Sequence, residues 1–388
     1  MTTEWIENAR LILPDQVIAC GALRMEDGMI TDLREGGAPG PALDAQGMTL
    51  LPGLVDLHGD MIERELEPRP GTRFDHDLAW MELDKRLATS GVTTAFASVS
   101  FADGLGLRTD SRALEIIQEL QVHRPHLLID HRLHARYEVS NTACQPHLLE
   151  LLQQRQIDLL SLMDHTPGQG QYRDLETYVQ YLARWLGQSA QSVRELAEHR
   201  MGAGTAEVWS LGAALGAEAC QQGIAVASHD DDTAQKVALV NDMGATISEF
   251  PVTLDAAQAA CRLGMMVFMG APNALRGRSH GGNLSALDAL EAGVLHGLAA
   301  DYSPMTMLQA VWRIAREERL SWPAAAALVT SAPAHATGFT DRGRLEVGTR
   351  ADLVLVEDQV RPRIRLTVCR GRSVFHDGAL NIPQWVVA

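Results

Sequence analysis

The feature that most constrains the fold is a long alternation of short apolar runs and amphipathic segments in the middle of the chain. Between residues 52 and 338, eight apolar runs of strand length are separated by segments with helical periodicity. Apolar strands that alternate with helices predict a parallel sheet covered by helices. The expected strands are residues 53–58, 93–100, 132–138, 159–164, 225–229, 246–250, 266–270 and 298–301. The expected helices include residues 78–89, 112–123, 175–200 (continuous or broken), 233–242 and 254–263.

Eight such units indicate a closed (β/α)₈ TIM barrel of the α/β class. The alternating segment has 287 residues, which fits a barrel of about 250 residues with insertions. An open, doubly wound sheet is the structural alternative. It is less favoured because neither a GxGxxG motif nor a P-loop follows any of the apolar runs.

The two ends of the chain have a different pattern, with short β-rich runs separated by turn residues. Neither end is long enough to bury a core by itself. We therefore expect residues 1–51 and 339–388 to form one small β-sandwich domain. The barrel domain would then comprise residues 52–338.

Composition excludes several classes of protein. A net charge of -16 argues against a general nucleic-acid binder, which would present a basic face. No apolar run approaches the roughly 20 residues of a membrane span, and the N-terminus lacks the apolar stretch of a secretory signal. The five cysteines are scattered without a CxxC pair, which is typical of a reducing compartment. We expect a cytoplasmic enzyme with a small-molecule substrate, and self-association into a homo-oligomer stays open.

Acidic and imidazole side chains fall at the expected carboxyl ends of the strands. His58 and Asp60 stand two residues apart at the end of the first strand, so both point to the same side. His165, His229 and Asp301 end the fourth, fifth and eighth strands. The carboxyl-end rim is where barrel enzymes place their active sites. One such histidine alone would more often be structural, but the set predicts one or two divalent metal ions. Imidazole and carboxylate ligands, with no thiolate among them, suit zinc, and manganese or iron(II) are the alternatives.

A centre with two metal ions also needs a bridging ligand. The only lysines, Lys85 and Lys236, lie in helical patterns, so a carboxylate is expected in place of a carboxylated lysine. Glu138, at the end of the third strand, is the first candidate. Glu249, at the end of the sixth strand, is the second candidate for the bridge. Its alternative role is to hold a ligand imidazole in place. The strand face that carries Glu138 also carries Arg132, His134 and Arg136.

Three consecutive acids, residues 230–232, directly follow His229. They could orient that imidazole or hold a further cation. Acids at the start of a helix more often cap its first turn, and this is the favoured interpretation.

The loop after the seventh expected strand carries cationic side chains on a glycine-rich backbone. Glycines let backbone N–H groups approach a phosphate, and arginine can bind it with two hydrogen bonds. A solvated surface loop is the alternative. The expected substrate-binding residues are Asn273, Arg276, Arg278, Ser279 and His280, together with Arg69 between two prolines.

Residues 51–60 and 343–354 resemble the amidohydrolase superfamily, whose members combine such a barrel with a split β-sandwich. Asp60 departs from the usual second histidine of the first strand. Within the superfamily the chain is most similar to diphosphatases of phosphonate metabolism, which release pyrophosphate from a ribose 5-triphosphate phosphonate. Gly59 stands where those enzymes have threonine. The matching segments are residues 68–70, 131–138, 161–169, 227–231, 249–251, 269–273, 276–283 and 301–302.

This resemblance implies a metal-dependent hydrolase. It gives Asp301 the role of a ligand or of the base that accepts a proton from water, and it makes His229 the other catalytic residue. The main alternative is an amidohydrolase acting on an amide, cyclic amide or amidine, which would not need the cationic loop. A catalytically inactive barrel that serves in binding or assembly would require the loss of ligands, and none is missing from the sequence.

Overall fold

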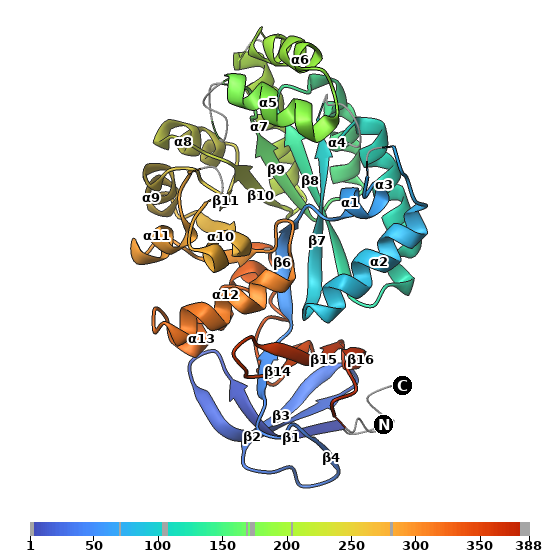
Figure 1. Cartoon of the computed structure of the whole chain (residues 1–388), viewed down its shortest axis with the longest axis vertical. Helices are drawn as coiled ribbons and strands as arrows, with labels where there is room; N and C mark the ends of the chain where they lie inside the picture. Colours follow the sequence, from blue (N-terminus) through green and yellow to red (C-terminus); the bar gives the residue numbers. More distant parts are fainter. Residues whose placement is uncertain are drawn as a thin grey trace.

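The computed structural model describes residues 4–69, 71–102, 108–167, 170, 175–202, 205–279 and 282–380. Its strands form two sheets, one from the middle of the chain and one from the two ends. Figure 1 shows the sheet of the chain ends at the lower end of the molecule, with the barrel above it.

The middle sheet has eight parallel strands that follow one another in sequence order. Their side chains are almost entirely buried, as expected where helices cover a sheet on its outside. The predicted (β/α)₈ barrel is therefore confirmed. Its strands are β6 (Leu54–Gly59), β7 (Val92–Phe101), β8 (Asp130–Glu138), β9 (Leu159–Met163), β10 (Ala225–His229), β11 (Ile247–Glu249), β12 (Met266–Gly270) and β13 (Gly297–Ala299).

The contact that closes the barrel, between β6 and β13, depends on one side chain and two backbone hydrogen bonds. The carboxylate of Asp56 accepts from the backbone N–H groups of His58 (3.2 Å) and Ala300 (2.8 Å). Beyond it, the N–H of Asp301 donates to the carbonyl of His58, and the N–H of Asp60 donates to the carbonyl of Asp301. The closure therefore places Asp301 directly beside the end of β6.

Helices pack around the outside of the barrel. The helix expected over residues 175–200 is two helices, because Gly187 adopts a left-handed backbone (φ 62°) that ends the first. No helix in the described part of the chain is long and apolar enough to cross a membrane. The helices are α1 (Ile62–Leu66), α2 (His76–Thr89), α3 (Asp110–His123), α4 (Gln145–Gln153), α5 (Leu175–Leu186), α6 (Ala190–Gly202), α7 (Thr205–Gln221), α8 (Ala234–Asp242), α9 (Leu254–Arg262), α10 (Ala271–Arg276), α11 (Ala286–Glu291), α12 (Met305–Arg316), α13 (Trp322–Ala327) and α14 (Ser331–Ala336).

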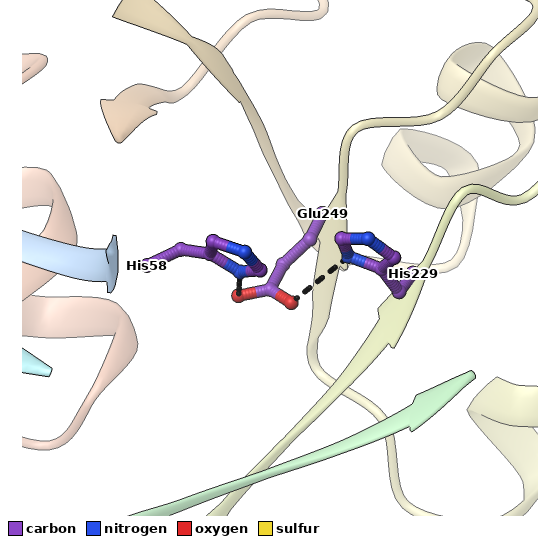
Figure 2. Close-up of side chains that lie close together, drawn as sticks. All are labelled: His58, His229 and Glu249. Carbon is purple, nitrogen blue, oxygen red and sulfur yellow. Dashed lines mark ion pairs between the residues drawn. The ribbon is translucent and has the colours of Figure 1, made fainter. Parts of the chain in front are cut away.

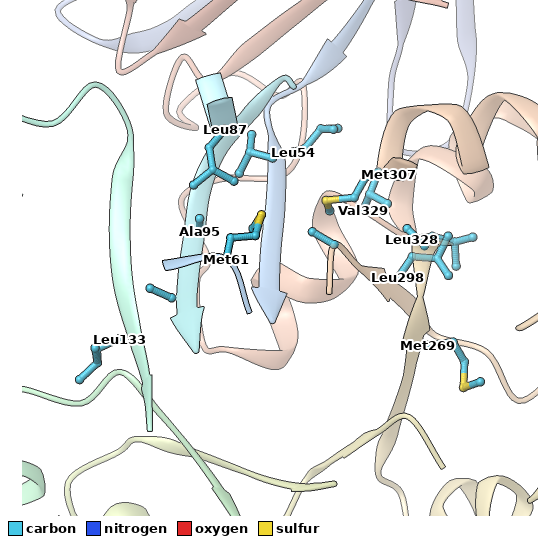
Figure 3. Packing of buried hydrophobic residues seen from close by; sticks show 14 of the residues in the cluster. Leu54, Met61, Leu87, Ala95, Leu133, Met269, Leu298, Met307, Leu328 and Val329 are labelled. Atoms are coloured by element: carbon cyan, nitrogen blue, oxygen red, sulfur yellow. The ribbon is translucent and has the colours of Figure 1, made fainter. Parts of the chain in front are cut away.

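One large apolar cluster joins the strands of the barrel to these helices. Figure 3 shows members of it, including Leu54 of β6, Leu87 of α2 and Met307 of α12, and all three are at most 1% exposed. Each leucine of this kind contributes about 1.5–3 kcal/mol through its burial. The cluster fixes the strands, and with them the positions of the side chains at their carboxyl ends.

The chain ends form a second, mostly antiparallel sheet, which confirms the small β domain made from both termini. β5 of the first end pairs with β14 of the last end, from Leu353 opposite Pro52 to Val356 opposite Thr49. Apolar side chains from both ends share one core. The residues at which this domain passes into the barrel stay a prediction. Its strands are β1 (Glu4–Ile12), β2 (Val17–Glu26), β3 (Met29–Glu35), β4 (Ala42–Asp44), β5 (Thr49–Pro52), β14 (Leu353–Glu357), β15 (Arg363–Cys369) and β16 (Arg372–His376).

Candidate metal centre

Two imidazoles face one carboxylate at the carboxyl end of the barrel (Figure 2). Nδ1 of His58 lies 3.3 Å from Oε1 of Glu249, and Nδ1 of His229 lies 3.5 Å from Oε2 of the same carboxylate. The two rings stack with an interplanar angle of 7°. His134 approaches from β8, with Nε2 3.7 Å from Oε2 of Glu249. All four side chains are buried.

A second group of potential ligands lies next to the first. Oδ2 of Asp230 is 3.6 Å from Nε2 of His165 and 3.7 Å from Nε2 of His229. Glu138 contacts His165, through Nδ1 (2.7 Å) and the backbone N–H (2.9 Å). The structure thus places Glu138 against one imidazole and Glu249 between two others. A bridging role for either carboxylate stays a prediction.

The unpaired atoms of the first group fit a metal ion when Nδ1 of His229 carries no proton. Among the described residues, Nδ1 of His58, Nδ1 of His229 and Oε1 of Glu249 have no aligned hydrogen-bond partner, although they are buried. Buried polar atoms are normally satisfied, so such atoms need an explanation. Zinc–ligand bonds of 2.0–2.2 Å place two ligand atoms of a tetrahedral ion about 3.3–3.5 Å apart. The contacts of 3.3 and 3.5 Å match that separation.

His229 belongs to both groups through opposite ring nitrogens. A neutral imidazole has one nitrogen with a free lone pair, while the other carries a proton. His229 can therefore hold a metal ion in only one of the two groups at a time. The protonation state of this ring decides which group is available.

Burial and charge shift the pKa values of the two stacked histidines in opposite directions. Burial opposes protonation of His58, but the Glu249 and Asp60 carboxylates outweigh it and raise its pKa to about 10. Burial lowers the pKa of His229 to about 4, opposed by Asp230 and assisted by Arg136. Without a bound cation, the Glu249 and Asp60 carboxylates favour the protonated form of His58. A metal ion that binds His58 must displace that proton.

Asp60 is held by arginine. Nη1 of Arg136 lies 2.7 and 2.8 Å from its two carboxylate oxygens, and Nη2 of Arg108 lies 3.7 Å from one of them. Although burial favours the protonated form, these two guanidinium groups and His58 hold the pKa of Asp60 well below its usual range. These neighbours therefore favour the ionised form of Asp60.

Three residues just beyond the ends of barrel strands adopt a left-handed backbone. They are Asp230 (φ 53°), Phe250 (φ 54°) and Asp301 (φ 56°). This conformation costs roughly 1–2 kcal/mol for a residue with a side chain. The cost at Phe250 is offset by packing, because its ring lies edge-on to His58 (4.8 Å) and His229 (5.4 Å). Strain of this kind is concentrated at functional sites.

The interpretation of the three consecutive acids as a helix cap is wrong. The residue that caps α8 is Thr233, whose side chain accepts from the backbone N–H of Lys236. Asp230 is therefore free of that role and faces His165 and His229. Asp231 accepts from the Ser228 hydroxyl and lies near Lys236, and Asp232 accepts from the backbone N–H of Gly170.

The expected substrate-binding residues lie in and around the end of α10. Arg276 and Arg278 are exposed, as is Arg69 on the segment after α1. The side-chain amide of Asn273 bonds to the backbone at Leu284 (3.1 Å) and Ala286 (3.0 Å), so it shapes the loop. Ser279 is half-buried, and His280 lies outside the described residues. Binding of substrate by this loop stays a prediction.

Comparison with known proteins shows the family. The sequence profile described as "Amidohydrolase family" matches residues 85–375. The chain belongs to the amidohydrolase family. It is therefore a hydrolase of a family whose members generally use metal ions, and the His, Asp and Glu groups at the strand ends are its candidate ligands.

The chain is also similar to one relative of named activity and to two solved structures. The chain is 36% identical over 362 residues to the alpha-D-ribose 1-methylphosphonate 5-triphosphate diphosphatase of Escherichia coli K12, covering 90% of this chain and 94% of the relative. A prolidase complexed with N-methylphosphonate-L-proline has a TM-score of 0.66 at 15% identity, covering 97% of this chain and 100% of that one. The 5-methylcytosine deaminase of Klebsiella pneumoniae has a TM-score of 0.65 at 16% identity, covering 98% and 100%. At such identities the two structures show the shared fold.

Sequence reasoning did not assign a role to two side chains of this site. Arg136 and His134 lie on the face of β8 that carries Glu138, and both are at most 3% exposed. The signal was present, because alternate residues of a barrel strand point inward together. An arginine and a histidine that point into a barrel need polar partners there. This requirement could have identified both as residues of the site.

Substitution of the two glutamates will distinguish their roles. If Glu249 orients His58 and His229, Glu249→Gln should weaken metal binding about 10- to 100-fold, the usual effect of losing a carboxylate that holds ligand imidazoles. Glu138→Gln should affect only the ion bound near His165. The measurement is metal content by elemental analysis after dialysis against graded chelator. If Glu138→Gln empties both positions while Glu249→Gln empties neither, Glu138 is the bridge.

Proposed function

We propose that this hydrolase cleaves a phosphoanhydride bond of a ribose 5-triphosphate that carries a phosphonate, and that it releases pyrophosphate. The observation that carries the proposal is the 36% identity, over 90% of this chain, to the Escherichia coli diphosphatase named for that substrate. We further propose that the reaction belongs to phosphonate catabolism. A cytoplasmic location and a homo-oligomeric state stay predictions.

The charges of the site support a phosphorylated substrate. Asp60, Asp230 and Glu249 would repel a polyphosphate if nothing balanced them. Arg136 and Arg108 supply positive charge beside Asp60. An arginine binds phosphoryl oxygens with several donors, so such groups suit a substrate with this charge.

The proposed ligands of the divalent metal are His58, Asp60, Glu138, His165, His229 and Asp301, to which the geometry adds Glu249 and Asp230. Zinc fits this donor set, and manganese or iron(II) are the alternatives. A bound ion would lower the pKa of water and neutralise phosphoryl oxygens. Asp301 would then accept the proton as the water oxygen attacks phosphorus and the anhydride P–O bond breaks.

Phosphorus NMR of the purified chain with zinc or manganese tests this function. With a ribose 5-triphosphate that carries a 1-phosphonate, we expect pyrophosphate and a 5-phosphate product in equal amounts. Dihydropyrimidine and N-acetyl sugar substrates serve as the comparison, because they test the amidohydrolase alternative. Turnover of a cyclic amide or an acetamide, with no cleavage of any triphosphate, would reject the proposal.

A further inference from the structure

The Arg136 guanidinium lies between two groups that are also candidate metal ligands. Nη1 contacts both oxygens of Asp60, at 2.7 and 2.8 Å, and Nη2 lies 3.0 Å from Nε2 of His229. The side chain is only 3% exposed, so water does not screen these contacts appreciably. β8 supplies Arg136, β10 supplies His229, and Asp60 directly follows β6. The arginine therefore links three separate parts of the rim.

The contact with His229 determines where the proton of that ring lies. A guanidinium group can only donate hydrogen bonds, so Nε2 must be the accepting nitrogen. The proton of the neutral ring is then on Nδ1, which faces Oε2 of Glu249 at 3.5 Å. In this arrangement the lone pair of Nε2 is already used.

A metal ion held by His165, His229 and Asp230 would need that same lone pair. Nε2 cannot accept from Arg136 and coordinate a cation at once, because it has one lone pair. Asp60 differs, because each of its oxygens has two lone pairs and can accept from Arg136 while it binds a cation. Arg136 and the cation therefore require the same lone pair, that of Nε2 of His229.

We propose that Arg136 is a positioning residue of the metal centre that competes with the metal ion for Nε2 of His229. In the metal-free chain it holds His229 in the Nδ1–H form and lies against Asp60. It must withdraw from Nε2 before an ion binds there. The competition follows from the protein's own contacts and does not depend on which substrate the enzyme hydrolyses.

Arg108 provides a matched control. Its Nη2 lies 3.7 Å from Asp60, and its Nε donates to Glu63 at 2.9 Å. Like Arg136, it places a positive charge beside Asp60. The contact with Nε2 of His229 is made by Arg136. If positive charge alone weakens metal binding, replacing either arginine should raise the metal affinity. If competition for Nε2 weakens it, only replacement of Arg136 should do so.

Calorimetric titration of the chelator-treated full chain with zinc tests the proposal. Arg136→Met is expected to bind zinc about tenfold or more tightly than the wild type, since it frees Nε2 of His229 from a hydrogen bond with a charged donor. Arg108→Met should shift the affinity by less than about threefold, because its charge lies farther from Asp60 and is partly exposed to solvent. Equal shifts in both variants, or no tightening in Arg136→Met, would overturn the competition.

Nitrogen NMR of histidine-labelled wild-type chain gives a second measurement that does not need Arg136→Met to fold. In the metal-free protein His229 should show a protonated Nδ1 and an accepting Nε2. Addition of zinc should shift the Nε2 resonance while Nδ1 keeps its proton. If the Nδ1 proton is lost, the ion lies on the Glu249 side and the proposal is wrong.

Discussion

Replacement of Asp301 by asparagine is expected to lower kcat by about 10²–10⁴-fold, the usual contribution of a positioned acid or base. The carboxyl group lies beside the end of β6, where its backbone bonds to His58 and Asp60. Burial, and then the negative charge of Asp60, raise its pKa to about 6. Such a group is ionised at neutral pH yet basic enough to accept a proton from water.

The pH dependence gives this prediction a definite sign. Asp301 acts as a base only when ionised, so kcat/KM of the wild type should fall as the pH drops below about 6. In Asp301→Asn the remaining activity should lack that decline. Asp288→Asn, at an exposed position on α11, is the matched control and should change neither rate nor profile. If Asp301→Asn keeps its metal ions and a near-normal rate, another group accepts the proton.

Asp130→Asn is expected to reduce the free energy of unfolding by about 3–5 kcal/mol, the cost of breaking a buried ion pair by removing one partner. Asp130 begins β8 and is 4% exposed. Its Oδ2 lies 2.6 Å from Arg342 and 3.1 Å from Arg350, both near the C-terminal part of the small β domain. Arg132 and Arg370 also reach this oxygen, at 3.0 and 3.3 Å. One carboxylate therefore joins the barrel to the small β domain.

Chemical denaturation of the variant and wild type measures this loss. Glu317→Gln is the control, because Glu317 also contacts two arginines, Arg313 and Arg319, but on the surface. Its effect should stay within about 1 kcal/mol. If both variants lose the same free energy of unfolding, burial does not make the ion pairs of Asp130 more important than those of Glu317.

Acid should lower the free energy of unfolding of the wild type in the same way, because it protonates Asp130. Although burial opposes ionisation, the arginines, led by Arg132, hold the pKa of Asp130 far below its ordinary value. A carboxylate with a lowered folded-state pKa stabilises the protein fully above its unfolded pKa of about 3.9, and this contribution is lost as the pH falls below that value. The difference in stability between wild type and Asp130→Asn should therefore be constant at neutral pH and shrink below about pH 4.

The sequence by itself determined the barrel and the rim on which its polar residues gather. Apolar periodicity depends on near neighbours, and it predicted β10 and β12 to the residue. The same periodicity placed His58, His165 and His229 at strand ends. Closure of the barrel then brings these ends together, although residues 58 and 301 are far apart in the chain.

Only the tertiary structure decided which of these side chains face one another. Glu249 lies between His58 and His229, and Arg136 joins Asp60 to His229, through contacts between strands that no local pattern specifies. The left-handed backbone of Asp301 is likewise imposed by its hydrogen bonds to the end of β6. Periodicity says that a residue points inward, but its partners depend on how neighbouring strands are staggered. Long-range packing sets that stagger, and so it decides the chemistry of the site.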